Sequence, residues 1–178
     1  MNVTREGGAV VRSLVPDLSR LLVATVGAGA SVGFLAPLTG EDATAWWRER
    51  AELAAAGRLA VWTARDGDRI LGTIGLVPAD KANSRHRAEI VKLMVHPDAR
   101  GRGVGRLLLS TAERDAARDG VTLLHLDTET DSPAERLYRS CGWTRAGVVP
   151  DYATNTDGEL RPTTIYYKRL PPPGGDGA

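Results

Sequence analysis

The sequence predicts one α/β (α+β) domain, built on a mixed central sheet of six to seven strands flanked by helices. Strand-like and helical segments follow one another over residues 1–170 in the order β-α-α-β-β-β-α-β-α-β-β, which is typical of a mixed sheet covered by helices. The 178 residues are 42% hydrophobic and 25% charged, as in ordinary soluble domains. The proline- and glycine-rich residues 171–178 are expected to form a disordered tail.

Caps and turns mark the predicted elements in the first half of the chain. Pro16 favours the first turn of one helix, and Thr39 is a good N-cap for a second helix that ends before Gly57. The Asp-Gly-Asp sequence at residues 66–68 indicates a hairpin turn. The predicted segments are a frayed start (1–8), a short strand (9–14), two helices (16–28 and 39–56), a flexible glycine-rich loop between them (27–36), and a hairpin (59–65 and 69–77).

The second half is organised around residues 88–110. Aliphatic and β-branched residues from Glu89 to Val95 predict a largely buried strand, which Pro97 ends. Apolar residues then recur with helical spacing from residue 103 or 104 to about 119. The remaining predicted segments are a strand (121–127), a helix opened by Ser132 and Pro133 (132–140), a strand (143–149), a long loop (151–161), and a last strand (162–170).

The loop at residues 100–105, Arg-Gly-Arg-Gly-Val-Gly, combines glycine with positive charge. Glycine lets a ligand approach the backbone closely, and the unpaired N–H groups of the following helix attract an anion. Arg100, Arg102 and Arg106 surround this point. A phosphate or pyrophosphate is therefore the expected occupant, and a basic surface turn that only caps the helix is the alternative.

Two motifs in these segments resemble those of the GCN5-related N-acetyltransferase (GNAT) family. The loop, read as Arg100-x-x-Gly103-x-Gly105, is similar to the family's acetyl-CoA signature. Residues 134–143, AERLYRSCGW, resemble its A-x-x-L-Y-x-x-x-G-F/W motif, and the element order agrees over nearly the whole chain. Residues 29–35, 125–129 and 162–166 are also similar to the tabtoxin-resistance type of acetyltransferase.

The resemblance implies acetyl-CoA as the cofactor. The loop amides would bind the pyrophosphate, and a bulge in the preceding strand would expose backbone groups to the pantetheine arm. Many relatives have asparagine near the position of Ser132, where its side chain holds CoA. The shorter serine is a departure from this family pattern. The implied cofactor-binding residues are Leu93, Met94, Val95, Arg100, Gly101, Arg102, Gly103, Val104, Gly105, Arg106, Ser132, Ala134 and Tyr138.

Acetyl transfer from a thioester to an amine needs a neutral amine, and free amines have pKa values of about 8 to 10, so a base helps. Glu89, which begins the organising strand, is the first candidate base, acting directly or through a water. Asp127, which ends the next strand, is the second, and it could instead hold the ammonium group of the substrate. The alternatives are a salt-bridged strand end for Glu89 and a turn aspartate for Asp127. Regular alternation would place Glu89, Val91, Leu93 and Val95 on one face.

The resemblance assigns Tyr138 as the general acid that protonates the departing thiolate, and an apolar helix-face tyrosine is the alternative. The Met94 N–H, at the expected bulge, could polarise the thioester carbonyl. His125 and Cys141 are interpreted as packing residues. The three histidines show no metal-ligand spacing, so no metal is expected.

Candidate substrate-binding residues lie on the flexible loop and on the helix after it. Trp46 and Trp47 are adjacent on that helix, so at most one of them faces the core. The substrate-binding candidates are Ser31, Phe34 and Trp47, together with Glu89 and Asp127.

The predicted function is acetyl-CoA-dependent N-acetylation of the primary amine of a small molecule, possibly an antibiotic-like amino acid, by direct attack in a ternary complex. The alternatives are acetylation of a protein lysine or N-terminus, and a non-catalytic module that binds CoA or another ligand. The net charge of +1 gives no support for nucleic acid binding, and neither a leader nor an apolar run of membrane-spanning length is visible. A cytoplasmic protein is expected, with antibiotic resistance as a role and a homodimer as one assembly, pairing through the C-terminal strand.

Overall fold

The computed structural model describes residues 1–171, and a seven-stranded sheet runs through the whole of this part. The strands lie in the order β1-β2-β3-β4-β5-β7-β6. All neighbouring strands are antiparallel except β4 and β5, which are parallel. The strands are β1 (Asn2–Glu6), β2 (Ala60–Asp66), β3 (Arg69–Pro78), β4 (Arg87–Val95), β5 (Leu123–Glu129), β6 (Thr144–Thr154) and β7 (Leu160–Arg169).

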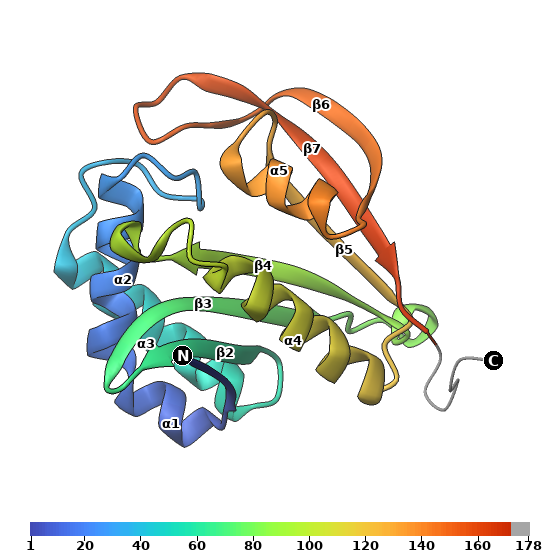
Figure 1. The fold of residues 1–178 in the computed structure, drawn as a ribbon, viewed down its shortest axis with the longest axis horizontal. Helices are drawn as coiled ribbons and strands as arrows, with labels where there is room; N and C mark the ends of the chain where they lie inside the picture. The colour runs from blue at the N-terminus through green and yellow to red at the C-terminus, as the bar shows by residue number, and fades with distance from the viewer. Residues whose placement is uncertain (172–178) are drawn as a thin grey trace.

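Five α-helices cover this sheet (Figure 1). Thr39 accepts a hydrogen bond from the Asp42 amide, as its predicted role as N-cap requires, and Ser132 caps the last helix in the same way through the Glu135 amide. The mixed α/β architecture expected from the sequence is confirmed. The helices are α1 (Gly8–Ser13), α2 (Val15–Gly27), α3 (Gly40–Ala55), α4 (Val104–Arg118) and α5 (Pro133–Ser140), with short 3₁₀ turns at Ala82–Ser84 and Pro97–Ala99.

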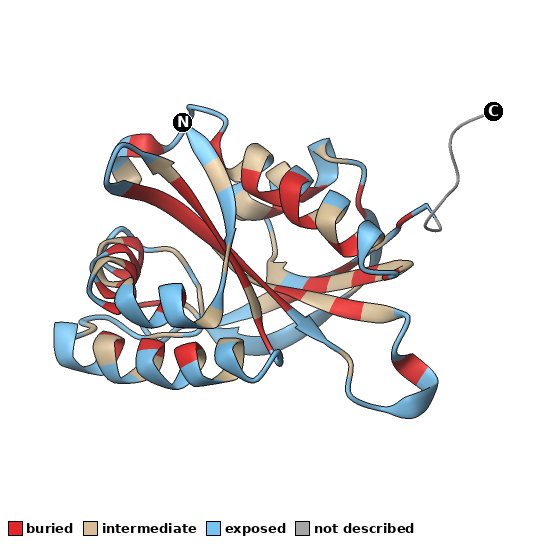
Figure 2. Cartoon of the chain, turned by 90° about the horizontal axis from the view of Figure 1, so that it is seen from below, coloured by how far each residue is buried: buried red, intermediate tan, exposed pale blue. Residues whose placement is uncertain are grey.

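Two apolar cores lie on the two faces of the sheet. One is formed with α1, α2 and α3 and contains Leu18, Leu22 and Trp47. The other is formed with α4 and α5 and contains Leu108 and Tyr166. Burying one large apolar side chain stabilises a fold by about 1.5–3 kcal/mol. Because each face of the sheet buries several such side chains, packing on both faces stabilises it. Figure 2 shows the buried residues along the strands and on the sheet-facing sides of the helices.

The N-terminal prediction was wrong. Residues 2–6 form β1, which pairs with β2, and the Glu6 carboxylate accepts hydrogen bonds from Thr63 and Arg65. Residues 9–14 were expected as a strand, but Gly8–Ser13 form α1, which packs against α3. The β-branched pair Val10-Val11 favoured a strand locally, but tertiary packing of Val11 in the core outweighs that preference.

Two details of the sheet differ from the prediction, and one predicted segment lies outside the described residues. The segment expected as a long loop at residues 151–161 is partly strand, because β6 extends to Thr154 and β7 begins at Leu160. The last strand, β7, lies between β5 and β6, so the expected pairing of two copies through it as an edge strand is wrong, and the edge strands are β1 and β6. The predicted disorder of residues 172–178 falls outside the described residues. In residues 1–171, no helix has the length and apolar character needed to cross a bilayer.

Candidate active site

The parallel strands β4 and β5 pair only at their start and then separate, which creates a fork in the middle of the sheet. The pairing runs from Arg87 opposite Leu123 to Glu89 opposite His125. Beyond this point β5 stays paired with β7, and β4 stays paired with β3. Figure 1 shows the two strands diverging, with α5 above the opening and α4 below it. We call this opening the β4–β5 fork.

A bulge in β4 lies at the mouth of the fork. Val91 is opposite Gly75 and Met94 is opposite Thr73, so two residues of β4, Lys92 and Leu93, face a single residue of β3. Lys92 has φ of 51°, a left-handed conformation that a non-glycine residue adopts only when its surroundings impose it. The sequence resemblance predicted a bulge, and the structure contains one.

This bulge reverses the alternation of side chains along β4. Val91 and Met94 pack toward α1–α3, whereas Leu93 and Val95 pack toward α4 and α5. The expectation that Glu89, Val91, Leu93 and Val95 share one face was therefore wrong, because the extra residue shifts the register by one. Met94 is buried in the α1–α3 core, so its side chain does not enter the fork, and the role of its backbone N–H stays a prediction.

The predicted anion-binding loop leads directly into the N-terminus of α4. Gly101 and Gly103 have φ values of 75° and 79°, and an added Cβ at either position would meet no atom within 4 Å. Gly103 is the N-cap residue, and within residues 1–171 no side chain caps the first turn of α4 and no acidic residue lies in it. The first-turn N–H groups are thus open to an anion, and exposed Arg100 and Arg102 add positive charge. These residues fit a pyrophosphate.

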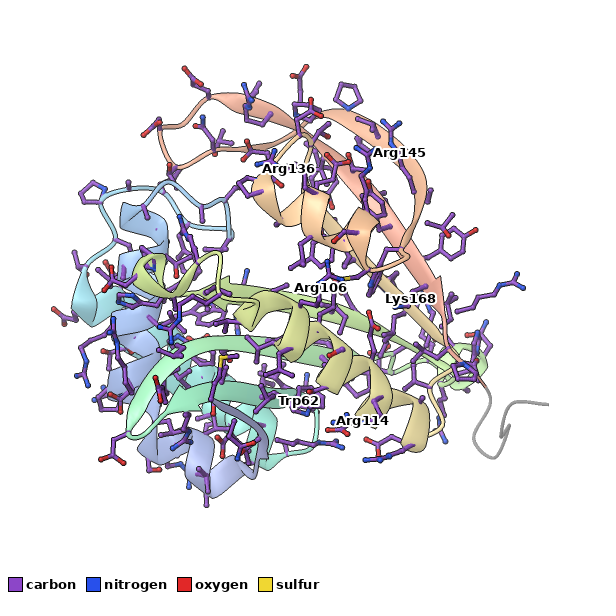
Figure 3. The ribbon with its side chains drawn as sticks, viewed as in Figure 1. Trp62, Arg106, Arg114, Arg136, Arg145 and Lys168 are labelled. Carbon is purple, nitrogen blue, oxygen red and sulfur yellow. The ribbon has the colours of Figure 1, made fainter. Side chains whose placement is uncertain are left out.

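Two other residues of the predicted loop have contacts within the protein. A Cβ at Gly105 would lie 3.0 Å from Leu137 Cδ2, so this glycine lets α4 approach α5 closely. Arg106 donates hydrogen bonds to Ser140 Oγ and to the Ser140 carbonyl. In Figure 3 Arg106 lies between α4 and α5. Gly105 and Arg106 therefore join the two helices that border the fork, and buried Val104 adds an apolar contact.

Two carboxylates lie on the α1–α3 side of the fork. Asp127 is exposed near the end of β5, and Glu89 is half-buried beside His125 where the strands begin to separate. Neither carboxylate has a hydrogen bond or ion pair with another residue of the described chain. They are free to accept hydrogen bonds from a cationic amine.

Lys92 lies between these carboxylates and the α2–α3 loop. Its Nζ donates a 2.7 Å hydrogen bond to the Val32 carbonyl. Burial lowers the pKa of Lys92, and the charges of Asp127 and Glu89 raise it in part while Arg50 lowers it further. Sequence analysis missed Lys92, although a lysine between Val91 and Leu93 in a largely buried strand was a signal for it.

Tyr138 lies on α5, among the buried residues on the α4 and α5 side of the sheet. It is buried, and its ring lies 5.8 Å from that of Trp143. Burial raises the pKa of Tyr138 well above its ordinary value, and the charges of Asp127 and Cys141 raise it further. The phenol is therefore protonated at neutral pH, as a proton donor must be. Asp127 thus acts electrostatically on both Lys92 and Tyr138.

The start of α5 is held by its own hydrogen bonds. Ser132 Oγ accepts from the Glu135 amide, while Glu135 accepts from the Asp131 amide and from the Tyr166 hydroxyl. Burial alone would raise the pKa of Glu135, but these hydrogen bonds hold it below the ordinary value. Ser132 therefore has a structural role as a cap, and half-buried Ala134 packs against the core. Their contacts with the cofactor stay predictions.

The tryptophan assignment was wrong. Trp47 is 2% exposed and belongs to the core, and its Nε1 has no partner among the described residues. Trp46 is the one that faces the α2–α3 loop, where its ring lies 5.4 Å from that of Phe34. Adjacent helix positions point about 100° apart, so the sequence required a choice that only packing decides. Ser31 is exposed on the loop.

The α2–α3 loop also reaches the far half of the sheet. The Ala36 amide donates a 2.9 Å hydrogen bond to the carbonyl of Thr156, a buried residue in the turn between β6 and β7. Figure 1 shows the loop and this turn meeting at the open end of the fork. This contact joins the β1–β4 half of the molecule to the β5–β7 half across the open end of the fork. We call the Ala36–Thr156 contact the roof of the fork.

A polar concavity of about 480 Å³ lies outside the fork, beside α5 and β6. It is lined by Glu135, Arg139, Arg145 and Tyr166, among others. Figure 3 shows Arg145 on β6 beside α5. None of the candidate catalytic residues lines this concavity.

Known proteins resemble this chain in sequence. A family model described as the acetyltransferase (GNAT) family matches residues 32–143. N-acetyltransferase 8B of Homo sapiens is 31% identical over 88 residues, which make up 48% of this chain and 39% of the human protein. N-acetyltransferase 8 of Rattus norvegicus is 32% identical over 88 residues, 48% of this chain and 40% of the rat protein. The chain thus matches about two fifths of the length of these relatives.

Solved structures show the same fold. A GCN5-related N-acetyltransferase from Kribbella flavida has a TM-score of 0.76 and 24% identity, covering 95% of this chain and 97% of its own. A ribosomal-protein-alanine N-acetyltransferase from Brucella melitensis has a TM-score of 0.74 and 21% identity, with coverage of 96% and 100%. The Salmonella typhimurium protein yncA, solved with its cofactor acetyl-CoA, has a TM-score of 0.73 and 20% identity, with coverage of 96% and 94%. The chain belongs to the acetyltransferase (GNAT) family of enzymes, whose cofactor is acetyl-CoA.

Proposed function

We propose that this protein transfers the acetyl group of acetyl-CoA to the primary amine of a small molecule, by direct attack in a ternary complex. The observation that supports a small acceptor is the roof formed by the Ala36–Thr156 hydrogen bond. A protein lysine or an N-terminal segment needs an open groove, and this contact crosses the end of the fork where such a groove would continue. The non-catalytic alternative needs the glycine loop but has no use for Asp127 or Tyr138.

Each residue or backbone group of the fork has a separate role in the proposed reaction. Gly101 and Gly103, with the first-turn amides of α4, bind the pyrophosphate, and acetyl-CoA supplies a thioester as the acetyl donor. Asp127 and Glu89 hold the acceptor's ammonium group, and one of them removes its proton before attack. The Met94 backbone N–H stabilises the negative charge that develops on the carbonyl oxygen. Tyr138 gives the proton of its hydroxyl to the departing sulfur.

The most direct test is to measure release of free CoA from acetyl-CoA across amino acids, aminoglycosides, polyamines, lysine peptides and N-terminal peptides. We expect turnover with a small amine. Turnover with peptides alone would favour the protein-acetylating alternative. Binding of acetyl-CoA by calorimetry without turnover of any acceptor would favour the binding module.

The assignment of the base is tested by pH–rate profiles of Glu89→Gln and Asp127→Asn. Loss of the base lowers kcat/KM by about 100-fold and moves the acidic limb of the profile. Glu41→Gln, an exposed carboxylate in the first turn of α3, is the matched control. Unchanged profiles in both fork variants would exclude both residues as the base.

The finer expectations remain predictions. They are the tabtoxin-resistance type, a role in antibiotic resistance and a cytoplasmic location. A homodimer would pair through β6, one of the two edge strands of the sheet, where Val148 and Val149 are each 37% exposed. Light scattering of the native protein and of Val149→Lys tests this, with a dimer that the substitution dissociates as the expected result.

A further inference from the structure

Lys92 occupies an unusual position for a charged residue. It lies at the bulge of β4, with φ of 51°, so its side chain departs from the regular alternation of the strand. Burial of a lysine in the middle of a sheet is disfavoured unless something at the site uses its charge.

The surroundings of Lys92 hold its ammonium group in one place. Nζ lies 5.6 Å from the ring centroid of Phe34 and 5.7 Å from that of Trp46, in the geometry of cation–π contacts. Its hydrogen bond to the Val32 carbonyl uses one of its three N–H donors. Two donors remain for a ligand in the fork.

A second cation lies beside the first. The Arg50 guanidinium is 4.6 Å from the ring centroid of Trp46, and its charge lowers the pKa of Lys92. The ion pair of Arg50 is with Glu49, at 3.6 Å, and the Glu49 side chain is 72% exposed. Lys92 forms no ion pair with any residue in the described part of the chain. The two cations share the Trp46 ring, and only one of them has a counterion, the exposed Glu49, so together they favour the binding of an anion.

Two carboxylates lie on the other side of Lys92. Asp127 and Glu89 are close enough to raise its pKa, although neither lies within ion-pair distance. The fork therefore presents negative groups beside the expected amine position and positive groups toward the α2–α3 loop.

We propose that the acceptor is a small amine that also carries a carboxylate, as an amino acid does. The amine binds at Asp127 and Glu89, and the carboxylate binds at Lys92 with help from Arg50. This inference rests on the proposed function and adds to it the substrate class and a specificity-determining residue. Sequence analysis named an amino acid only as a possibility and assigned no residue to its carboxylate.

Matched pairs of acceptors test the proposal. Tyrosine and tyramine, histidine and histamine, and lysine and cadaverine differ by the α-carboxylate alone. For the accepted pair, kcat/KM of the native enzyme is expected to favour the amino acid by tenfold to a hundredfold, on the order of one hydrogen bond to a charged group. In Lys92→Met this ratio falls toward one, chiefly through the KM of the amino acid, and Lys92→Arg restores part of it.

Lys81→Met is the matched control, because Lys81 is an exposed lysine in the loop before β4. It should keep the native ratio. Equal use of both members of a pair by the native enzyme, or an unchanged ratio in Lys92→Met, would overturn the carboxylate site while leaving acetylation of amines in place. If no amine of the panel were acetylated, the proposed function would be overturned, and the proposed carboxylate site with it.

Discussion

The two ends of the β4–β5 fork are built in different ways. The end that we assign to the cofactor comes from one continuous stretch, the end of β4, the glycine loop and the first turn of α4. The acceptor end is assembled from the α2–α3 loop, α3, the β4 bulge, β5 and the β6–β7 turn, which are far apart in sequence. Backbone groups dominate the first end, and side chains dominate the second. The cofactor end can therefore stay constant while substitutions at the acceptor end change the substrate.

The largest predicted effect concerns Tyr138, which we assign to the sulfur of the cofactor, where the two substrates would meet. Tyr138→Phe should lower kcat by about 100-fold, because it removes the proton donor but keeps the buried ring. Steady-state kinetics at saturating acetyl-CoA measure this. Tyr152→Phe removes the hydroxyl of an exposed tyrosine on β6 and is the control. Normal turnover by Tyr138→Phe would contradict the assignment of the general acid.

The next effect separates backbone strain from cofactor binding. Gly103 and Gly120 lie at opposite ends of α4 with φ values of 79° and 86°, and a Cβ at either would meet nothing within 4 Å. Alanine should destabilise both variants by about 1–2 kcal/mol. Calorimetry should show weaker acetyl-CoA binding, on the order of tenfold, in Gly103→Ala alone. Equal acetyl-CoA affinities in the two variants would contradict the assignment of cofactor binding to this loop.

A smaller effect is expected at the roof of the acceptor end. Asn155 Oδ1 accepts hydrogen bonds from the Asp157 and Glu159 amides and so shapes the turn that carries Thr156. Asn155→Ala removes these hydrogen bonds and should destabilise the native conformation of the turn by about 1 kcal/mol. The acceptor KM should then rise about fivefold, with little change in the KM of acetyl-CoA. Asp157→Ala is the control on the same turn. A change confined to acetyl-CoA would show that this turn serves the cofactor end.

The smallest effect is a gain in stability. The pKa of Lys92 is lowered in the folded protein, so unfolded chains bind more protons between the folded value and the ordinary value of 10.5. The native protein is therefore destabilised by this charge at neutral pH and recovers stability as pH rises through that window. Lys92→Met should raise Tm at pH 7 by about 2 °C, and the gain should shrink toward pH 10. A lower Tm at pH 7 would show that the charge stabilises the fold.

Local signals explain why much of the fold could be predicted. The helix caps at Thr39 and Ser132, the hairpin at residues 66–68 and the glycine loop depend on neighbouring residues, and the structure contains each of them. The polar segment Asn2–Glu6 becomes a strand only because β2 offers it an edge. Such pairing is a tertiary property that no local pattern encodes.

The acceptor site shows the same limit. Phe34 lies against Trp46 and Lys92, and its role in substrate binding stays a prediction. The choice between Trp46 and Trp47, the register shift at Lys92 and the contact between Ala36 and Thr156 depend on packing between distant segments. The local structure of the stretch assigned to the cofactor could therefore be predicted more completely from the sequence than that of the stretch assigned to the acceptor.

The central claim is that both substrates occupy the fork together and that the amine attacks directly. Initial velocities measured with acetyl-CoA and the acceptor both varied test this claim. Intersecting lines in the double-reciprocal plot are the predicted result. Parallel lines, together with an acetylated form of the protein after incubation with acetyl-CoA alone, would contradict it and would point instead to a covalent intermediate, with Cys141 as the residue to examine.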